Sequence, residues 1–436
     1  MKNAFALIVV AGLALPAVAA EPVSRDEVRS MVSEMMADAE TRSSLLQGGA
    51  TAGYDKNFFL ASADNKYRLN VSGYTQFRYT ARVADNDNTL NGGGVGTGSD
   101  FGHGFNIRRT VLAFSGNAGS ESLKYSVRLI SKNGDSIVND DAFVAYELGG
   151  GWGLKAGQYK VGFLKEELNS DSATMAADRG FVNSFFSQGR SQAVSLYYLS
   201  DNFDGTFDFS DGARGEGRKT FGSGSDTVST SALVADWAVT GRGEFRFAGT
   251  RAQLRDYTSR QDEKYAGNVG AAFHLQGQAN NAQGVTGTDT TLLGYTVDAQ
   301  IEGGGFGAFL AFVGTHSEVS GASTTDKIKR DDFGFVAQGN YRVLPDADLF
   351  AKYELIMLDG DRNIQKNYQF VTFGANHYFA GNAAKLTVDC VFSLNHTDGL
   401  VGTTLIGGGF DGNTLGLTGT NSGGEMALRA QVQVMF

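Results

Sequence analysis

Cysteine, proline and long apolar runs are scarce in this chain of 436 residues, and each scarcity excludes a class of protein. The single cysteine, Cys390, excludes a disulfide framework, a cysteine-rich zinc site and the lipidated cysteine of a lipoprotein. Three prolines beside 59 glycines argue against flexible linkers, which usually contain both residues. Beyond the first twenty residues no apolar run is long enough for a transmembrane helix. If the remaining chain lies in a membrane, it does so without such helices.

The charge balance excludes nucleic acid as a partner. The formal net charge is −10, whereas phosphate backbones require a basic face. Charged residues make up 19% and hydrophobic residues 42% of the chain, so it is neither a disordered tail nor a bundle of membrane helices.

No constellation of residues predicts catalysis, a metal site or a cofactor. The five histidines share no ligand or triad spacing, and no G-x-S-x-G motif occurs. Asp85-Asn86-Asp87-Asn88 and Asp359-Gly360-Asp361-Arg362-Asn363 resemble fragments of calcium loops, but both lack the closing glutamate. We therefore expect a protein that is not an enzyme and that holds neither metal nor cofactor.

The first fifty residues divide into a targeting segment and a helix. Lys2, an apolar core and the small residues 17–20 form a secretory signal peptide, residues 1–20. Residues 21–52 contain a capping box and apolar residues at helical spacing, then a Gly/Ala linker. Three of these apolar residues also fit heptad positions, so a short coiled coil is an alternative to an amphipathic helix. Residues 53–436 remain as one β-domain.

Alternation of polar and apolar residues dominates the chain from Tyr67 onward. An even number of strands places both ends of a sheet on the same side, as single-chain outer-membrane barrels require. The predicted fold class is all-β, a 16-stranded antiparallel transmembrane β-barrel with a short N-terminal helix. The sixteen strands are expected at residues 67–79, 105–117, 122–132, 138–148, 152–160, 191–200, 203–210, 232–247, 265–278, 289–302, 305–318, 331–343, 347–358, 367–379, 384–396 and 425–436.

The connections between these strands alternate in length. Three of the first four odd-numbered connections are long, whereas the even-numbered ones are tight turns such as 118–121 and 149–151. Long loops on one rim and short turns on the other are typical of outer-membrane barrels, and a soluble sandwich has no reason for this asymmetry. The connection 248–264 is an exception on the short side.

The last strand ends in an aromatic residue. Leu428, Val432, Val434 and Phe436 share its apolar face. A terminal aromatic on the lipid face resembles the signal by which outer-membrane barrels are recognised for assembly, so Phe436 is the candidate assembly signal. The alternative is an edge strand of a soluble sheet.

Several motifs resemble one family. Phe105–Gly116 resembles the second strand of the phosphate-selective porins O and P, and Leu123–Leu129, Asp141–Tyr146 and Leu154–Phe163 are similar to the strands that follow. Gln188–Arg190 resembles the segment that closes the constriction loop of that family. The resemblance implies a trimeric 16-stranded channel whose third long loop folds into the lumen.

A channel needs charged side chains on its inner wall rather than nucleophiles. The first five strands place more basic than acidic residues on or near that wall, although for Arg108 and its neighbour Arg109 the facing stays open. A polar lining without function is the alternative, because any wet barrel has one. The candidate basic residues are Arg68, Arg78, Arg108, Lys124, Arg128 and Lys155.

The segment 161–190 is the candidate constriction loop. It lacks the lysine cluster that the family uses there, and its three phenylalanines could pack it against the wall. A surface loop is the alternative. Its candidate residues are Lys165, Glu166, Glu167, Arg179 and Arg190.

These observations together predict an outer-membrane porin, a passive diffusion channel for small hydrophilic solutes with a mild preference for anions such as phosphate. The alternative is a general or carbohydrate-type porin for neutral or cationic solutes. An outer-membrane enzyme would need a paired histidine and hydroxyl, and an adhesin would need a plugged lumen, whereas the inward face is expected to be polar. The expected partners are outer-membrane lipid and lipopolysaccharide, the barrel assembly machinery, two further copies of the chain in a homotrimer, and small ionic solutes.

Overall fold

A computed structural model of the chain contains a closed antiparallel β-barrel of sixteen strands. The structure describes residues 33, 49–84, 101–214, 235, 237–278, 290–320, 327–362, 367–400, 404–405, 408–409, 412–419 and 424–436. The barrel strands are β3 (Arg68–Ala84), β4 (Phe101–Asn117), β5 (Leu123–Lys132), β6 (Val138–Gly149), β7 (Trp152–Lys160), β8 (Arg190–Leu199), β9 (Phe203–Ser210), β10 (Trp237–Ala248), β11 (Ala266–Gln278), β12 (Thr290–Gly303), β13 (Phe306–Ser320), β14 (Lys327–Leu344), β15 (Ala347–Met357), β16 (Asn367–Tyr378), β17 (Ala384–Ser393) and β20 (Glu425–Met435).

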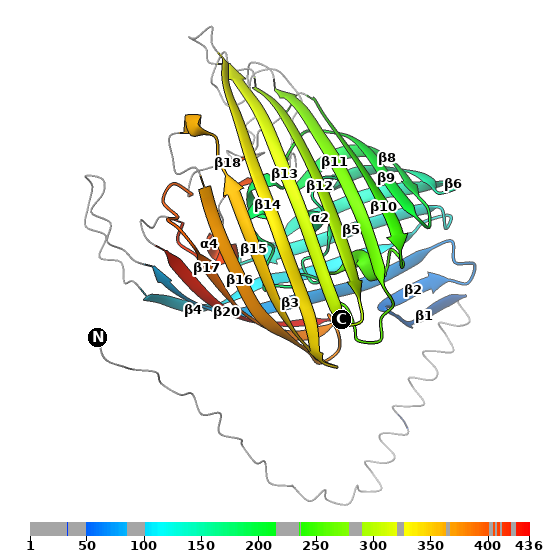
Figure 1. The fold of residues 1–436 in the computed structure, drawn as a ribbon. Coiled ribbons are helices and arrows are strands. Elements are labelled where there is room, and N and C mark those ends of the chain that lie inside the picture. Colours follow the sequence, from blue (N-terminus) through cyan, green and yellow to red (C-terminus); the bar gives the residue numbers. More distant parts are fainter. Residues whose placement is uncertain are drawn as a thin grey trace, which may run out of the picture. The chain divides into compact units, whose positions relative to one another are not determined.

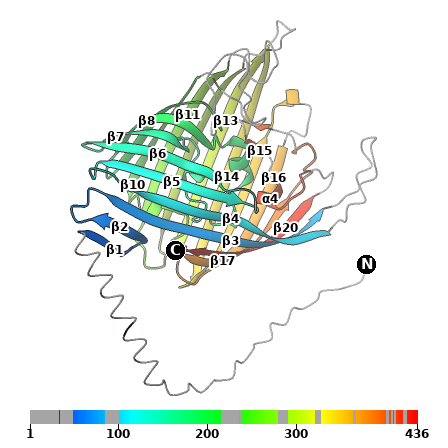
Figure 2. The same ribbon diagram turned by 180° about the vertical axis from the view of Figure 1, so that it is seen from behind.

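Each barrel strand pairs with its neighbours in the chain, and the last strand pairs with the first. Figure 1 shows β11 to β16 side by side on one wall, and Figure 2 shows β3 to β8 on the other. β20 joins β3 from Glu425↔Ala84 to Met435↔Tyr74, which closes the sheet. The prediction of a 16-stranded antiparallel barrel is confirmed.

The shorter elements were not predicted from the sequence. β1 (Ala50–Asp55) and β2 (Asn57–Ser62) form a hairpin, and β2 pairs with residues 68–71 of β3, which lie beyond the end of β20. The hairpin thus covers the part of the β3 edge that the last strand leaves unpaired. The remaining elements are α2 (Lys165–Leu168), α3 (Phe181–Phe186), α4 (Gly412–Leu415), η1 (Gln253–Arg255), η3 (Gly360–Arg362), β18 (Thr404–Leu405) and β19 (Gly408–Gly409).

The predicted signal peptide and nearly all of the predicted N-terminal helix lie outside the described residues. Within the part of the chain that is described, none of the helices has the length and apolar character needed to cross a bilayer.

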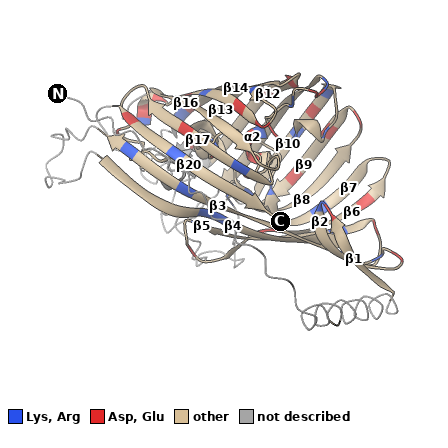
Figure 3. Cartoon of the chain, turned by 90° about the horizontal axis from the view of Figure 1, so that it is seen from below, with Lys and Arg blue, Asp and Glu red and all other residues tan. Residues whose placement is uncertain are grey.

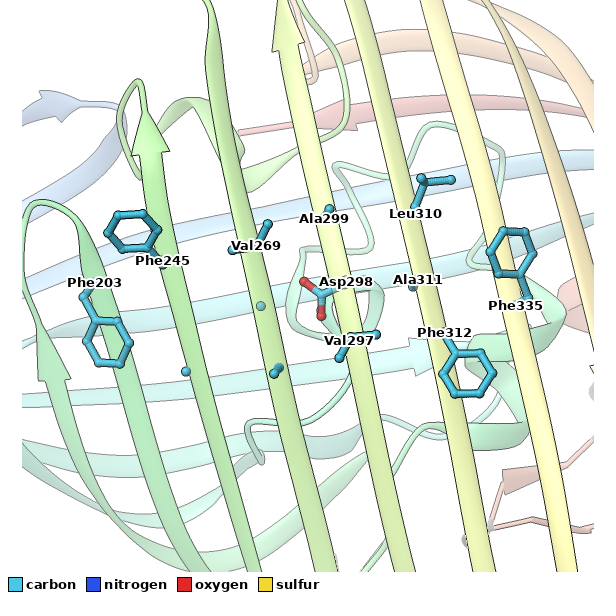
Figure 4. Close-up of a pocket in the computed structure, with 13 residues that line it drawn as sticks. Phe203, Phe245, Val269, Val297, Asp298, Ala299, Leu310, Ala311, Phe312 and Phe335 are labelled. Atoms are coloured by element: carbon cyan, nitrogen blue, oxygen red, sulfur yellow. The ribbon is translucent and has the colours of Figure 1, made fainter.

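The strands alternate between an apolar outer face and an inner face that carries most of the charge. In β15, for example, Asp348, Lys352 and Glu354 are buried inside, whereas Leu349 is 53% exposed on the outside. The outer face contains an apolar depression of about 690 Å³ across β9 to β14, whose outward side chains surround it in Figure 4. Because this depression lies outside the barrel, it is not part of the lumen.

The segment 161–189, which includes α2 and α3, lies inside the barrel and is largely buried. Phe181 of α3 stacks on Phe370 of β16, with 3.5 Å between the ring centroids and 2° between the planes. Phe185 and Phe186 have no exposed surface, and they belong to one apolar cluster with inward residues of β12 to β17. The inner face of this wall is therefore polar with apolar residues interspersed, and these apolar residues give the segment a dry surface on which to pack.

Candidate functional site

Two consecutive arginines of β4 both face the lumen because a β-bulge interrupts the alternation. Gln76 of β3 pairs with Arg109 and Phe77 pairs with Ile107, so Arg108 is the extra residue. Arg108 is 3% and Arg109 is 4% exposed. Simple alternation would turn one of the two toward lipid, and the bulge explains why neither points there.

Asp178 of the segment 161–189 is the common partner of three arginines. Its Oδ2 lies 2.6 Å from Nε of Arg108 and 2.8 Å from Nη2 of Arg78, and its Oδ1 lies 2.6 Å from Nη2 of Arg109. Burial by itself raises the pKa of Asp178, but the three guanidiniums outweigh burial and hold that pKa well below its usual range. Asp178 therefore stays ionised and ties the segment to β3 and β4.

Asp171 forms a second junction with the same wall. Its Oδ1 accepts hydrogen bonds from the hydroxyl of Tyr74, at 2.6 Å, and from Nη2 of Arg128, at 2.9 Å. Arg128 is also ion-paired with Asp140 of β6. Burial raises the pKa of Asp171, but Arg128 and Arg109 lower it more, so that the pKa lies well below its usual range.

Two of the predicted pore-lining residues lie at the rim of short turns. Arg68 opens β3, and its guanidinium lies 4.1 Å from the ring centroid of Phe59 and 3.9 Å from Asp55. Lys124 is ion-paired with Glu147, and both side chains are about half exposed. Among the described residues, no ion pair or hydrogen bond joins either of them to the segment 161–189, whereas Arg78, Arg108 and Arg128 are ion-paired with it.

Charged residues of α2 attach the segment to two further strands, β10 and β15. Nζ of Lys165 lies 2.9 Å from Glu244 of β10. Oε1 of Glu166 lies 2.6 Å from Nζ of Lys352 on β15, and it also accepts the backbone N–H of Gly180 at 3.0 Å. The segment therefore reaches from β3 and β4 to β10 and β15.

The remaining predicted residues of the segment bind one another and the strand ends beside them. Oε1 of Glu167 lies 3.6 Å from Lys160 and 3.7 Å from Arg179. Arg190 begins β8, and its Nη2 lies 2.7 Å from Asp140. The structure thus brings all five predicted loop residues into ion pairs, and none of them is exposed.

A cavity of about 250 Å³ lies between α2, the inner faces of β7, β9 and β10, and the segment 249–265 that follows β10. The charged residues of β7 are basic, those of β9 are acidic, and β10 carries both signs; Figure 3 colours the basic and acidic residues of the chain. The charged residues that line the cavity are Lys155, Lys160, Lys165, Arg242, Arg251 and Arg255, with Asp204, Asp208 and Glu244. Basic residues therefore outnumber acidic ones by six to three around this space.

Lys155 is the only one of the six predicted pore-lining residues that lines this cavity. Its Nζ lies 3.6 Å from the ring centroid of Tyr159. Among the described residues, no carboxylate lies within 4.0 Å of Lys155 or of Arg255 in an ion pair.

Sequence reasoning missed Asp171 and Asp178 as junctions, and it missed the inward course of the segment 249–265. The acidic residues were visible in the loop, but their partners come from strands up to about a hundred residues away. Within the described residues, no group of three or more His, Cys, Asp or Glu side chains could hold a metal ion.

Phe436 completes the closure of the barrel. Its backbone N–H donates to the carbonyl of Gly73 at 2.9 Å, and the N–H of Gly73 donates to the carbonyl of Phe436 at 3.0 Å. A Cβ on Gly73 would lie 2.6 Å from the Phe436 ring, so glycine leaves the room that this ring occupies. The ring is about half exposed on the outer face.

Solved porin structures share this fold. An anion-selective porin from Comamonas acidovorans is 13% identical, with a TM-score of 0.53 over 84% of this chain and 99% of that chain. OmpF of Salmonella typhi, in complex with daunomycin, is 12% identical, with a TM-score of 0.53 over 88% and 100%. A trimer form of OmpT from Vibrio cholerae is 14% identical, with a TM-score of 0.50 over 84% and 99%.

A comparison with curated protein sequences finds no match. The family model for the phosphate-selective porins O and P matches residues 77–398, which is most of the barrel. With the closed barrel of sixteen strands and the charged lumen, this match shows that the chain belongs to the phosphate-selective porin O and P family and is a channel-forming porin of the outer membrane.

Proposed function

We propose that this porin is a passive diffusion channel with a mild preference for small anions, phosphate among them. The observation that carries the proposal is the cavity beside α2, where six basic residues face three acidic ones. Fixed charges in a narrow space are poorly screened, so a net positive lining raises the local concentration of anions.

Lys155 and Arg255 are the cations best placed to meet a solute. Lys165, Arg242 and Arg251 each have a carboxylate partner within 3.0 Å, which cancels much of their field. Lys155 contacts the Tyr159 ring instead, and Arg255 is exposed. The preference should therefore be weak and should decrease as salt screens it.

A second candidate is a general or carbohydrate-type porin. It is favoured by the carboxylates that face the arginines of β4 and β5. Asp171 and Asp178 offset arginines that a count of the strands alone would leave positive. If these carboxylates determine the electric field along the whole lumen, the channel would admit neutral or cationic solutes as well as it admits anions.

The experiment is the reversal potential of the channel in a planar bilayer with a gradient of potassium chloride at low salt. If the channel prefers anions, the reversal potential of the wild type has the sign of anion selectivity. In Lys155→Gln the reversal potential should shift toward that of a cation-selective channel. The matched control is Lys124→Gln, because Lys124 is half exposed at the rim and paired with Glu147. A wild type that selects cations at low salt would favour the second candidate.

We also propose that the segment 161–189 is the constriction. Its burial inside the barrel and its ion pairs with β4, β5, β10 and β15 support this role. Deleting residues 170–180 should raise the single-channel conductance, and an unchanged conductance would contradict the role.

The remaining proposals concern assembly. Residues 1–20 are proposed to export the chain, Phe436 to be its assembly signal, and the barrel assembly machinery, lipid and lipopolysaccharide to be its partners. A homotrimer is supported by the trimer form of the Vibrio cholerae protein. The proposed mechanism is diffusion without catalysis, metal, cofactor or nucleic acid.

A further inference from the structure

One connection on the rim of short turns is much longer than the others. The segment 249–265 joins β10 to β11, whereas the other connections on that rim span two to five residues. Its apolar residues are not presented to the outside, since Leu254 is 1% and Tyr257 is 3% exposed. Such a segment must find its partners within the barrel.

The partners of this segment come from strands that are far apart in the ring. Nε of Arg251 lies 2.7 Å from Asp204 of β9, and Nε2 of Gln300 on β12 donates to the carbonyl of Asp256. Nδ2 of Asn382, in the turn before β17, donates to Oδ2 of Asp256 at 3.0 Å. β9 is the seventh and β17 the fifteenth strand of the ring of sixteen, so the partners of the segment span about half of that ring.

The middle of the segment lies against β13 and β14. The Tyr257 and Phe309 ring centroids are 5.0 Å apart, and Nε of Arg342 donates to the carbonyl of Ser259 at 3.3 Å. A Cβ on Gly307 would approach the Tyr257 carbonyl to 2.9 Å, so the absence of a side chain there admits the segment. These contacts hold it at a defined depth.

The two inward segments meet. Tyr257 belongs to the same buried apolar cluster as Phe163 and Leu164 at the start of the segment 161–189. Leu254 and Arg255 line the cavity of about 250 Å³ together with residues of α2. The lumen is therefore occupied from both rims, and the cavity lies where the two segments approach each other.

We propose that the segment 249–265 is a second constriction element, which narrows from the turn rim the same lumen that the segment 161–189 narrows from the loop rim. Solutes then pass between the two segments, and Arg255 provides charge on the turn-rim side of the passage. The inference rests on the proposed role of the segment 161–189 as the first constriction.

The test replaces residues 250–264 by Gly-Gly, which leaves β10 and β11 able to pair as a hairpin. Single-channel conductance is measured in 1 M salt, where fixed charges are screened and the value reports width. We expect an increase of about twofold or more, because the narrowest part of a pore dominates its resistance. If the variant with the shortened connection keeps the wild-type conductance, the inference is overturned.

A pair of milder variants decides the question if the shortened chain does not fold. Tyr257→Ala removes the buried ring and should raise the conductance or its fluctuations. Arg260→Gln is the matched control, because Arg260 lies in the same segment, is 72% exposed and pairs only with the equally exposed Asp262 among the described residues. Equal conductance of these two variants and the wild type would overturn the inference.

The outcomes separate this inference from the proposed function. Higher conductance of the shortened variant with a cation-selective wild type would support the second constriction and contradict the anion preference. If conductance rises on deletion of residues 170–180 but not in the variant with the shortened connection, the first constriction is supported and the second is contradicted.

Discussion

At the scale of single residues, Asp178 lowers the positive charge of the inner wall on β3 and β4. One carboxylate shared by three guanidiniums in a water-poor site attracts each of them strongly, because the effective dielectric constant is low there. A count of basic residues on the strands therefore overstates the positive field that a solute meets. The cavity beside α2 adds Lys155 and Arg255, which are not ion-paired with any carboxylate among the described residues.

We predict that Asp178→Asn releases the segment 161–189 from β3 and β4. Removing one partner from a buried ionic network costs about 3–5 kcal/mol, because the arginines stay buried without a counter-charge. Single-channel conductance should rise and become noisier. Asp64→Asn is the control, since Asp64 is exposed beside Lys66 at the rim and should change nothing. Wild-type conductance in Asp178→Asn would show that the junction does not hold the segment.

At the scale of elements, the segment 161–189 has too little structure to be stable by itself. Its helices have four and six residues, well below the length at which an isolated helix persists. Its conformation therefore depends on the wall: Asp171 and Asp178 bind the arginines on one side, and Phe181 packs on Phe370 on the other.

The pH dependence of this docking follows from the depressed pKa values of Asp171 and Asp178. A lowered pKa stabilises the docked state fully above the pKa of a free aspartate, about 3.9, and the stabilisation is lost as the pH falls through the lower docked value. Conductance should therefore stay constant from pH 7 to about pH 4 and rise only in stronger acid. A rise between pH 7 and pH 5 would contradict this assignment.

At the scale of the whole molecule, closure depends on the pairing of β20 with β3. The two strands meet along their length, and the pairing ends at the contact of Phe436 with Gly73. The hairpin of β1 and β2 covers the next residues of the β3 edge. Closing the edge in this way removes unpaired backbone groups, which lipid cannot satisfy.

We predict that Phe436→Ser lowers the amount of barrel inserted in the outer membrane, because the ring is lost from the seam and from the lipid face. The measurement is the fraction of protein in outer-membrane preparations that shifts in electrophoretic mobility on heating. Met435→Leu is the matched control, since it keeps an apolar residue beside the seam. Equal insertion of Phe436→Ser and the wild type would remove Phe436 as an assembly signal.

The sequence by itself determined the number of strands, the short and long rims and the closing strand. These are local properties, because the alternation of residues such as Arg429, Gln431 and Gln433 with apolar neighbours depends only on the period of a strand. The tertiary structure alone decided that Arg108 and Arg109 both face inward, that Asp178 offsets part of their charge, and that the segments 161–189 and 249–265 meet inside the barrel. These features depend on which surfaces come together across the barrel, and no local pattern in the chain encodes contacts between walls so far apart in sequence.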